Sequence, residues 1–311
     1  MSLAPFVQIL GRGPGRSRSL TMDEATAAME IMLAPDAAPE AVGALLMLLR
    51  MKGETAEEIA GLAKAAQAAM PEMPKADLDW PCYAAGRTRG APWFLLSARM
   101  VADAGHRVLL HGWNGADKKV RDGLFAAGIH VAASPDEAEN LLARDGIAYL
   151  PLEDMHPALF ALLRLREVLG LRSCINTVCR MLNPAQATSS VQGVFHPSYR
   201  LLQAVAAALL GWQNLTVIKG GGVEFERHPA KDIAAFGLRD GAAWEGSFHA
   251  FIAETRRLAE PTAAYDLTRP SDFDEQVIIG TAAAALATLG TTDAHDTARK
   301  LWHARQPRDA A

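Results

Sequence analysis

The chain has 311 residues, of which 50% are apolar and 21% are charged. This length and composition are sufficient for a large hydrophobic core in one or two domains, and they exclude a wholly disordered protein. The three cysteines form no CxxC pair, which argues against a disulfide framework or a structural zinc site and favours a reducing compartment. No apolar run reaches the roughly 18 residues of a membrane helix, and the first twenty residues lack a signal-peptide pattern. We therefore expect a soluble, cytoplasmic protein without a membrane partner.

The formal net charge of −4 conceals a long basic block. Between residues 155 and 223, five arginines and Lys219 are opposed by a single acid, Glu167. One positively charged face would suit a polyanionic ligand. The alternative is that these cations are scattered over a solvated surface, because charges separated in sequence need not converge in space.

The sequence pattern of residues 1–75 predicts a helical domain. Two capping boxes, Thr21 with Glu24 and Thr55 with Glu58, begin helices over 21–33 and 55–70. The segment 41–53 between them is apolar nearly all round and ends in a glycine, which is typical of a buried helix. No strand pattern interrupts these helices.

From residue 76 to 311, short apolar runs alternate with helical segments, which indicates parallel β-α-β units. The pattern predicts strands over 106–112, 128–134, 147–152 and 215–222, and helices over 120–127, 136–146, 156–170, 198–211, 244–258 and 272–289. The fold class is therefore α/β, with an N-terminal helical lobe and a larger lobe built on a mainly parallel sheet.

Several short motifs contain residues suited to binding a ligand or a metal, but none matches a known sequence signature in full. Three glycines follow a predicted strand at 220–222, where backbone amides could approach a phosphate, although a tight turn is the simpler interpretation. Glu224 and Glu226 would point the same way on a strand and could bind Mg²⁺, although surface carboxylates are more common. His111 ends a strand before a glycine turn, where ligands often bind in parallel sheets. Cys174 and Cys179 are most simply buried small hydrophobes.

Three stretches resemble the anthranilate phosphoribosyltransferase family, which has the family-3 glycosyltransferase fold. They are the opening helices with LTMDEATAAMEIML and ALLMLLRMKGETAEEIAGLAKA, the segment MHPALFALLRLREVLGLRSCINTVCRMLNPA, and SVQGVFHPSY. The resemblance covers essentially the whole chain. It implies that helices from about 158 to 188 pack on the helical lobe, and that the chain forms a homodimer through this lobe.

The resemblance fails at the residues that hold phosphoribosyl pyrophosphate and metal in that family. The GTGGD loop of the family falls on residues 82–86, the Asn-Ile-Ser-Thr that follows falls on 92–95, and the KHGNR loop falls on 110–114. The Asp-Glu metal pair falls on Glu224 and Phe225, while the arginine that faces the aromatic acid is retained as Arg166. These replacements remove the charge-assisted contacts that position the leaving group. We therefore expect no catalytic residues, no metal site and no cofactor.

The replacements resemble those in the YbiB-type, anthranilate-phosphoribosyltransferase-like DNA-binding proteins. GRGPGRSRSLTMDEA and WPCYAAGRTRGAPWFLL carry this resemblance, which implies homodimers that bind DNA or RNA without strong sequence preference. Cations that could line the former substrate cleft and contact phosphates are Arg87, Arg89, Lys118, Lys119, Arg121, Arg164, Arg166, Arg172, Arg180, Lys219 and Arg227. Tyr83 and Trp113 are candidates for stacking unpaired bases, whereas Trp93 is better assigned to the core.

Two interpretations of function follow from this. The first is a sequence-tolerant nucleic-acid-binding protein without catalysis, and the second is a transferase or phosphorylase that uses a ribosyl phosphate in a rewired site. The altered phosphate-binding motifs favour the first. Each candidate residue could also be ordinary core or surface, so binding to a heparin or DNA column is the observation that separates the interpretations.

Overall fold

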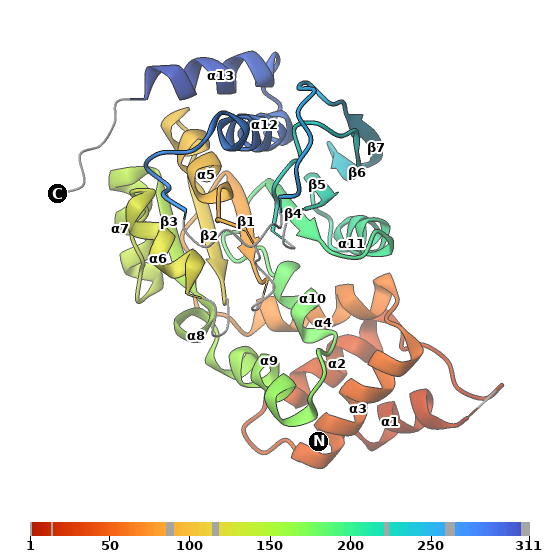
Figure 1. Cartoon of the computed structure of the whole chain (residues 1–311). Helices are drawn as coiled ribbons and strands as arrows, with labels where there is room; N and C mark the ends of the chain where they lie inside the picture. The colour runs from red at the N-terminus through yellow and green to blue at the C-terminus, as the bar shows by residue number, and fades with distance from the viewer. Residues whose placement is uncertain are drawn as a thin grey trace.

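The computed structural model describes residues 2–13, 15–84, 90–113, 118–220, 224–258 and 265–305. Four helices form an N-terminal lobe, and a seven-stranded sheet covered by helices forms the larger lobe (Figure 1). This is the predicted α/β class with a helical lobe. No helix within the described ranges is both long enough and apolar enough to cross a membrane.

The helical lobe consists of α1 (Ala4–Gly11), α2 (Met22–Leu33), α3 (Pro39–Lys52) and α4 (Ala56–Ala68). Both predicted capping boxes are present. The hydroxyl of Thr21 accepts from the amide of Glu24, whose side chain accepts from the amide of Thr21, and Thr55 and Glu58 repeat the arrangement. Helix α1, which the sequence pattern does not predict, packs on α3.

The sheet has the strand order β3-β2-β1-β4-β5-β6-β7. Its strands are β1 (Leu78–Cys82), β2 (Val108–Gly112), β3 (Ile147–Pro151), β4 (Ser189–Val194), β5 (Asn214–Lys219), β6 (Ile233–Arg239) and β7 (Ala242–Phe248). The first five are parallel, whereas β6 and β7 are antiparallel to their neighbours. The carboxyl ends of β1, β2 and β4 point toward the helical lobe (Figure 1).

Helices cover both faces of the sheet. The helices that follow the N-terminal lobe in the chain are α5 (Phe94–Asp103), α6 (Lys119–Ala126), α7 (Pro135–Asp145), α8 (Leu152–Met155), α9 (Pro157–Leu169), α10 (Ile175–Arg180), α11 (Ser198–Leu209), α12 (Asp272–Thr288) and α13 (Ala294–Ala304). Helices α5, α12 and α13 contact one another on one face (Figure 1). Helix α10 packs on α4, and His156, at the start of α9, contacts the carbonyl of Ala66 at 3.1 Å. These contacts place α9 and α10 against the helical lobe.

Two expected elements are wrong. The segment 244–258 is not a helix, because its first residues form β7 in a hairpin with β6. Asp240 and Gly241 connect these strands with φ values of 50° and 75°, and a two-residue Asp-Gly turn with both φ positive matches the twist of a hairpin. The predicted strand over 128–134 is reduced to one bridge, between Val131 and Tyr149.

Candidate functional site

A cavity of about 480 Å³ lies where the helical lobe meets the end of β4. Four arginines line it: Arg50 from α3, Arg166 from α9, Arg172 from the α9–α10 connection, and Arg180 from α10. No acidic side chain is among the described residues that line this cavity. We refer to it as the arginine pocket, and its lining favours an anionic ligand.

Backbone oxygens and an aromatic ring orient three of these four guanidinium groups. Arg180 is buried, and its Nη1 donates to the carbonyl of Gly193 at 3.1 Å. The Nη2 of Arg172 donates to the carbonyl of Ala84 at 2.8 Å. The guanidinium of Arg166 lies 5.9 Å from the ring centroid of Trp113. Arg166, Arg172 and Arg180 are therefore oriented by the fold itself.

One wall of the arginine pocket is aromatic. The rings of Phe195 and His196 lie 4.8 Å apart, edge to face, and the ring of Tyr199 lies 6.5 Å from that of His196. The hydroxyl of Tyr199 donates to Glu54 at 2.9 Å, and burial raises the pKa of this tyrosine to about 12. No local sequence pattern marks these rings as a site, although Phe195 and His196 directly follow β4.

Three of the predicted phosphate-binding cations, Arg166, Arg172 and Arg180, converge in the arginine pocket. Trp113 lies beside it, under Arg166, with its ring edge-to-face against Phe160 at 5.7 Å. Sequence reasoning missed Arg50, because nothing in the local pattern of α3 relates it to residues more than a hundred positions away.

The other described cations lie outside the pocket lining. Arg121 pairs with Glu153, and Arg164 pairs with Glu167 on the exposed surface of α9. Lys118 and Lys119 stand at the start of α6, and Lys219 is exposed at the end of β5. Arg87 and Arg89 lie outside the described residues.

Arg227 occupies an environment unlike the predicted cleft. Its guanidinium lies over the rings of Phe248 and Phe251, at 5.1 and 4.8 Å, and its Nη2 donates to the carbonyl of His249. Burial lowers the pKa of this arginine to about 10. It therefore serves the packing beside β7, and the expectation that it faces the cleft is not met.

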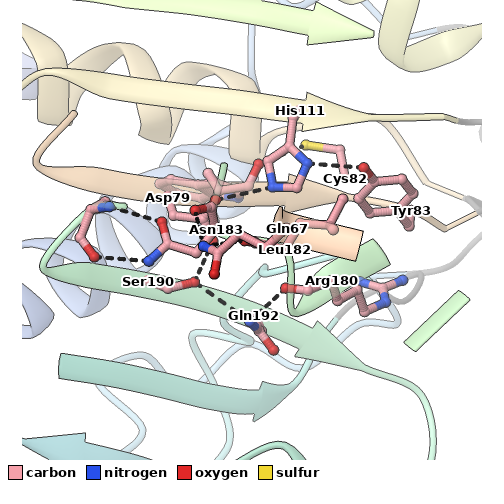
Figure 2. Close-up of polar contacts among 12 residues, drawn as sticks. Gln67, Asp79, Cys82, Tyr83, His111, Arg180, Leu182, Asn183, Ser190 and Gln192 are labelled. Atoms are coloured by element: carbon pink, nitrogen blue, oxygen red, sulfur yellow. Dashed lines mark hydrogen bonds and ion pairs between the residues drawn. The ribbon is translucent and has the colours of Figure 1, made fainter. Parts of the chain in front are cut away.

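Tyr83 belongs to a buried polar network (Figure 2). Its hydroxyl contacts Nδ1 of His111 at 2.9 Å, and Nε2 of that histidine contacts Asp79 at 3.0 Å. The hydroxyl of Ser190 donates to the other oxygen of Asp79 at 2.7 Å. All four residues are inaccessible to solvent. Tyr83 therefore offers no surface for stacking a base, and His111 is engaged inside the sheet.

Glu224 and Glu226 are buried rather than exposed. The carboxylate of Glu224 accepts from the amide of Ala84 at 2.7 Å, and that of Glu226 accepts from the amide of Phe94, the first residue of α5, at 3.1 Å. Burial raises their pKa values to about 7 and about 8, respectively. Phe225, between them, packs edge-to-face on Trp80 in the core. Both carboxyl groups therefore accept hydrogen bonds from backbone amides of the sheet lobe.

Comparison with known proteins places this architecture in a family. Residues 5–70 match the glycosyl transferase family, helical bundle domain, and residues 94–243 match the glycosyl transferase family, a/b domain. The chain is 32% identical to the anthranilate phosphoribosyltransferase of Deinococcus radiodurans over 74% of its length and 70% of that protein. It is 34% identical to the enzyme of Anaeromyxobacter sp., over 66% of this chain and 62% of that protein.

Solved structures show the same fold. Anthranilate phosphoribosyltransferase from Thermus thermophilus has a TM-score of 0.77 at 22% identity, covering 97% of this chain and 94% of that one. The Saccharomyces cerevisiae enzyme in complex with PRPP and Mg has a TM-score of 0.76 at 15% identity, covering 96% and 92%. The chain therefore belongs to the glycosyl transferase family defined by these two domains. Within that family, the relatives it resembles are anthranilate phosphoribosyltransferases, whose scaffold it shares.

Proposed function

We propose that this protein binds DNA or RNA without strong sequence preference, as a homodimer and without transferase activity. It would thus belong with the YbiB-type DNA-binding proteins of the family. The observation that carries the proposal is the convergence of Arg50, Arg166, Arg172 and Arg180 on one cavity. A guanidinium group can donate two parallel hydrogen bonds to two oxygens of one phosphate. Neutralising the charge of a nucleic-acid backbone also releases its counterions, which favours binding. Both effects act on any sequence.

Phosphoribosyl transfer is the second candidate, because the relatives are named for it. Two contacts argue against this activity. The amide of Phe94 at the start of α5 is bonded to Glu226, and the amide of Ala84 is bonded to Glu224. Helix starts and loop amides are the groups with which proteins hold phosphates, and internal carboxyl groups take both positions in this chain. We therefore propose that the phosphoribosyl pyrophosphate and metal motifs are degraded.

A fluorescence-anisotropy titration tests the binding function. Single- and double-stranded oligonucleotides of unrelated sequence are titrated at several salt concentrations. We expect similar affinities for unrelated sequences of equal length and a linear fall of log K with log salt. Arg50→Ala should weaken binding, whereas Lys64→Ala, which replaces an exposed cation of the same lobe outside the pocket lining, serves as the matched control. Absence of salt-dependent binding by the wild-type protein would refute the proposal.

A further inference from the structure

We propose that the arginine pocket receives one unpaired nucleotide of the bound strand, with its phosphate on the arginines and its base against the aromatic wall. This inference rests on the nucleic-acid-binding function proposed above. It adds the substrate class of the site, which is a single-stranded segment or a frayed end in preference to intact duplex.

The size of the pocket limits what can enter. At about 480 Å³ it falls within the range of roughly 300–1,000 Å³ that is typical of sites for small molecules. One nucleotide is a ligand of this class, whereas a duplex is not. Bases inside a duplex are stacked and paired, so a protein pocket reaches them only when they are unpaired or flipped out.

The walls of the pocket provide complementary chemistry for the two ends of a nucleotide. Arg50 on α3 and Arg180 on α10 reach the same cavity from two different helices, so that a phosphate bound there would meet guanidinium groups from both. Phe195 is 49% exposed, and with His196 it offers a ring surface to a base. Base–aromatic stacking tolerates any sequence, because every base has a π-face.

A third observation points to a ligand with a hydrogen-bond donor. Gln203 lines the arginine pocket and is only 1% exposed, yet its Oε1 has no hydrogen-bond partner among the described residues. A buried acceptor without a partner is unfavourable, and such groups in native proteins usually indicate an absent ligand, ion or water. Each of the four bases carries an N–H donor on its pairing edge. An unpaired base would satisfy Gln203, whereas a phosphodiester of the nucleic-acid backbone, which carries no proton, would not.

The backbone of the sheet lobe braces the pocket. Asn176, which lines the pocket, donates from Nδ2 to the carbonyl of Tyr83 at 3.2 Å. Arg172 donates to the next carbonyl, that of Ala84. Tyr83 is itself fixed by His111 in the buried network. This wall is therefore pre-organised, which reduces the entropy lost when a nucleotide binds.

Isothermal titration calorimetry with adenosine monophosphate, adenosine and inorganic phosphate tests the inference directly. We expect the monophosphate to bind at least tenfold more tightly than either part, because only it engages both the arginines and the rings. It should also displace a fluorescent single-stranded oligonucleotide more effectively than it displaces a duplex of equal length.

Two variants separate ligand recognition from folding. Arg50→Ala should weaken monophosphate binding by about tenfold or more, whereas Lys64→Ala should leave it unchanged. Gln203→Met removes the unpartnered oxygen at similar volume. It should weaken monophosphate binding without lowering the melting temperature, whereas a purely structural role for Gln203 predicts the reverse.

The outcomes distinguish this inference from the proposed function. If oligonucleotides bind but the monophosphate neither binds nor competes, the pocket inference is wrong and the binding function stands. If inorganic phosphate binds as tightly as the monophosphate, the site recognises an anion only and the inference fails. If oligonucleotides do not bind at all, both the function and the inference are lost.

Discussion

The carboxyl group of Glu226 accepts a hydrogen bond from the backbone amide of Phe94, at 3.1 Å, at the first residue of α5. The first turn of a helix presents unsatisfied amides and partial positive charge, which favour an anion. In this chain a side chain from the segment after β5 takes that position. An incoming phosphate would have to displace it.

We predict that the protein does not transfer a phosphoribosyl group to anthranilate. The prediction rests on the proposed loss of the phosphate and metal motifs, which the Glu226–Phe94 contact and the burial of Phe225 support. Phosphoribosyl pyrophosphate with Mg²⁺ should not raise the melting temperature, whereas a ligand at 100 times its Kd would contribute about 2.7 kcal/mol. An active anthranilate phosphoribosyltransferase is the positive control. Clear turnover or stabilisation would contradict the prediction.

The raised pKa of Glu226 predicts a specific pH dependence of stability. Burial raises this pKa from its ordinary 4.5 to about 8, so the folded state holds a proton that the unfolded state releases between these values. The stabilisation is complete below about pH 4.5 and is lost as the pH rises through about 8, with a total on the order of a few kcal/mol. Denaturant unfolding from pH 5 to pH 8.5 measures it.

Glu226→Gln, a neutral isostere, should reduce that decline in the free energy of unfolding. Glu254→Gln, at an exposed position, should keep the wild-type profile. An identical pH profile for wild type and Glu226→Gln would show that Glu226 is not the group responsible.

The buried network predicts a stability loss for Tyr83→Phe. This change removes the hydroxyl that contacts Nδ1 of His111 and leaves that nitrogen buried without its partner. The cost should be about 1–3 kcal/mol, read from urea unfolding. Tyr265→Phe is the control, because Tyr265 is only partly buried and its hydroxyl lies 3.5 Å from the carbonyl of Lys119. Equal effects of the two changes would contradict the network's role.

We predict a two-fold dimer through the helical lobe. Helix α3 is apolar nearly all round, and although Leu45, Leu46 and Leu49 are buried, Met51 on its last turn is 82% exposed. Light scattering at micromolar concentration should give twice the chain mass of 33.3 kDa. Met51→Asp should shift the mass toward the monomer, whereas Phe125→Asp on α6 should not. A monomeric wild-type protein would refute the prediction.

The salt dependence of the binding constant should measure how many phosphates the protein contacts. For duplex ligands the slope of log K against log salt is about −0.9 for each neutralised phosphate. Replacing Arg87 and Arg89 together by alanine should make the slope shallower by about two, equally for unrelated sequences. Replacing Lys118 and Lys119 together by alanine should change the slope in the same way. Arg305 and Arg308, replaced together by alanine, serve as the control pair. If only this replacement weakened binding, the binding site would be the C-terminal tail and the prediction would be wrong.

Local sequence accounts well for the helical lobe and for the class of the fold. The contacts in the capping boxes of Thr21 and Thr55 lie within three residues, so residue type and spacing determine them wherever the chain goes. Alternation of apolar runs with helical segments likewise indicates a parallel sheet. Strands β1 and β4 escape that pattern, because Asp79, Ser190 and Gln192 interrupt their apolar runs, and hydrogen bonds across the sheet satisfy Asp79 and Ser190.

For the site, the sequence placed Arg166, Arg172 and Arg180 in one basic stretch, and they do share a cavity. It did not place Arg50 or Gln203 beside them, and it assigned Tyr83 to a binding surface although the side chain is fully buried. The spacing of charges along a chain does not specify distances between elements more than a hundred residues apart. Those distances depend on how the helical lobe packs against the sheet, and only the tertiary structure decides which guanidinium groups line a cavity and which polar groups close on one another inside the core.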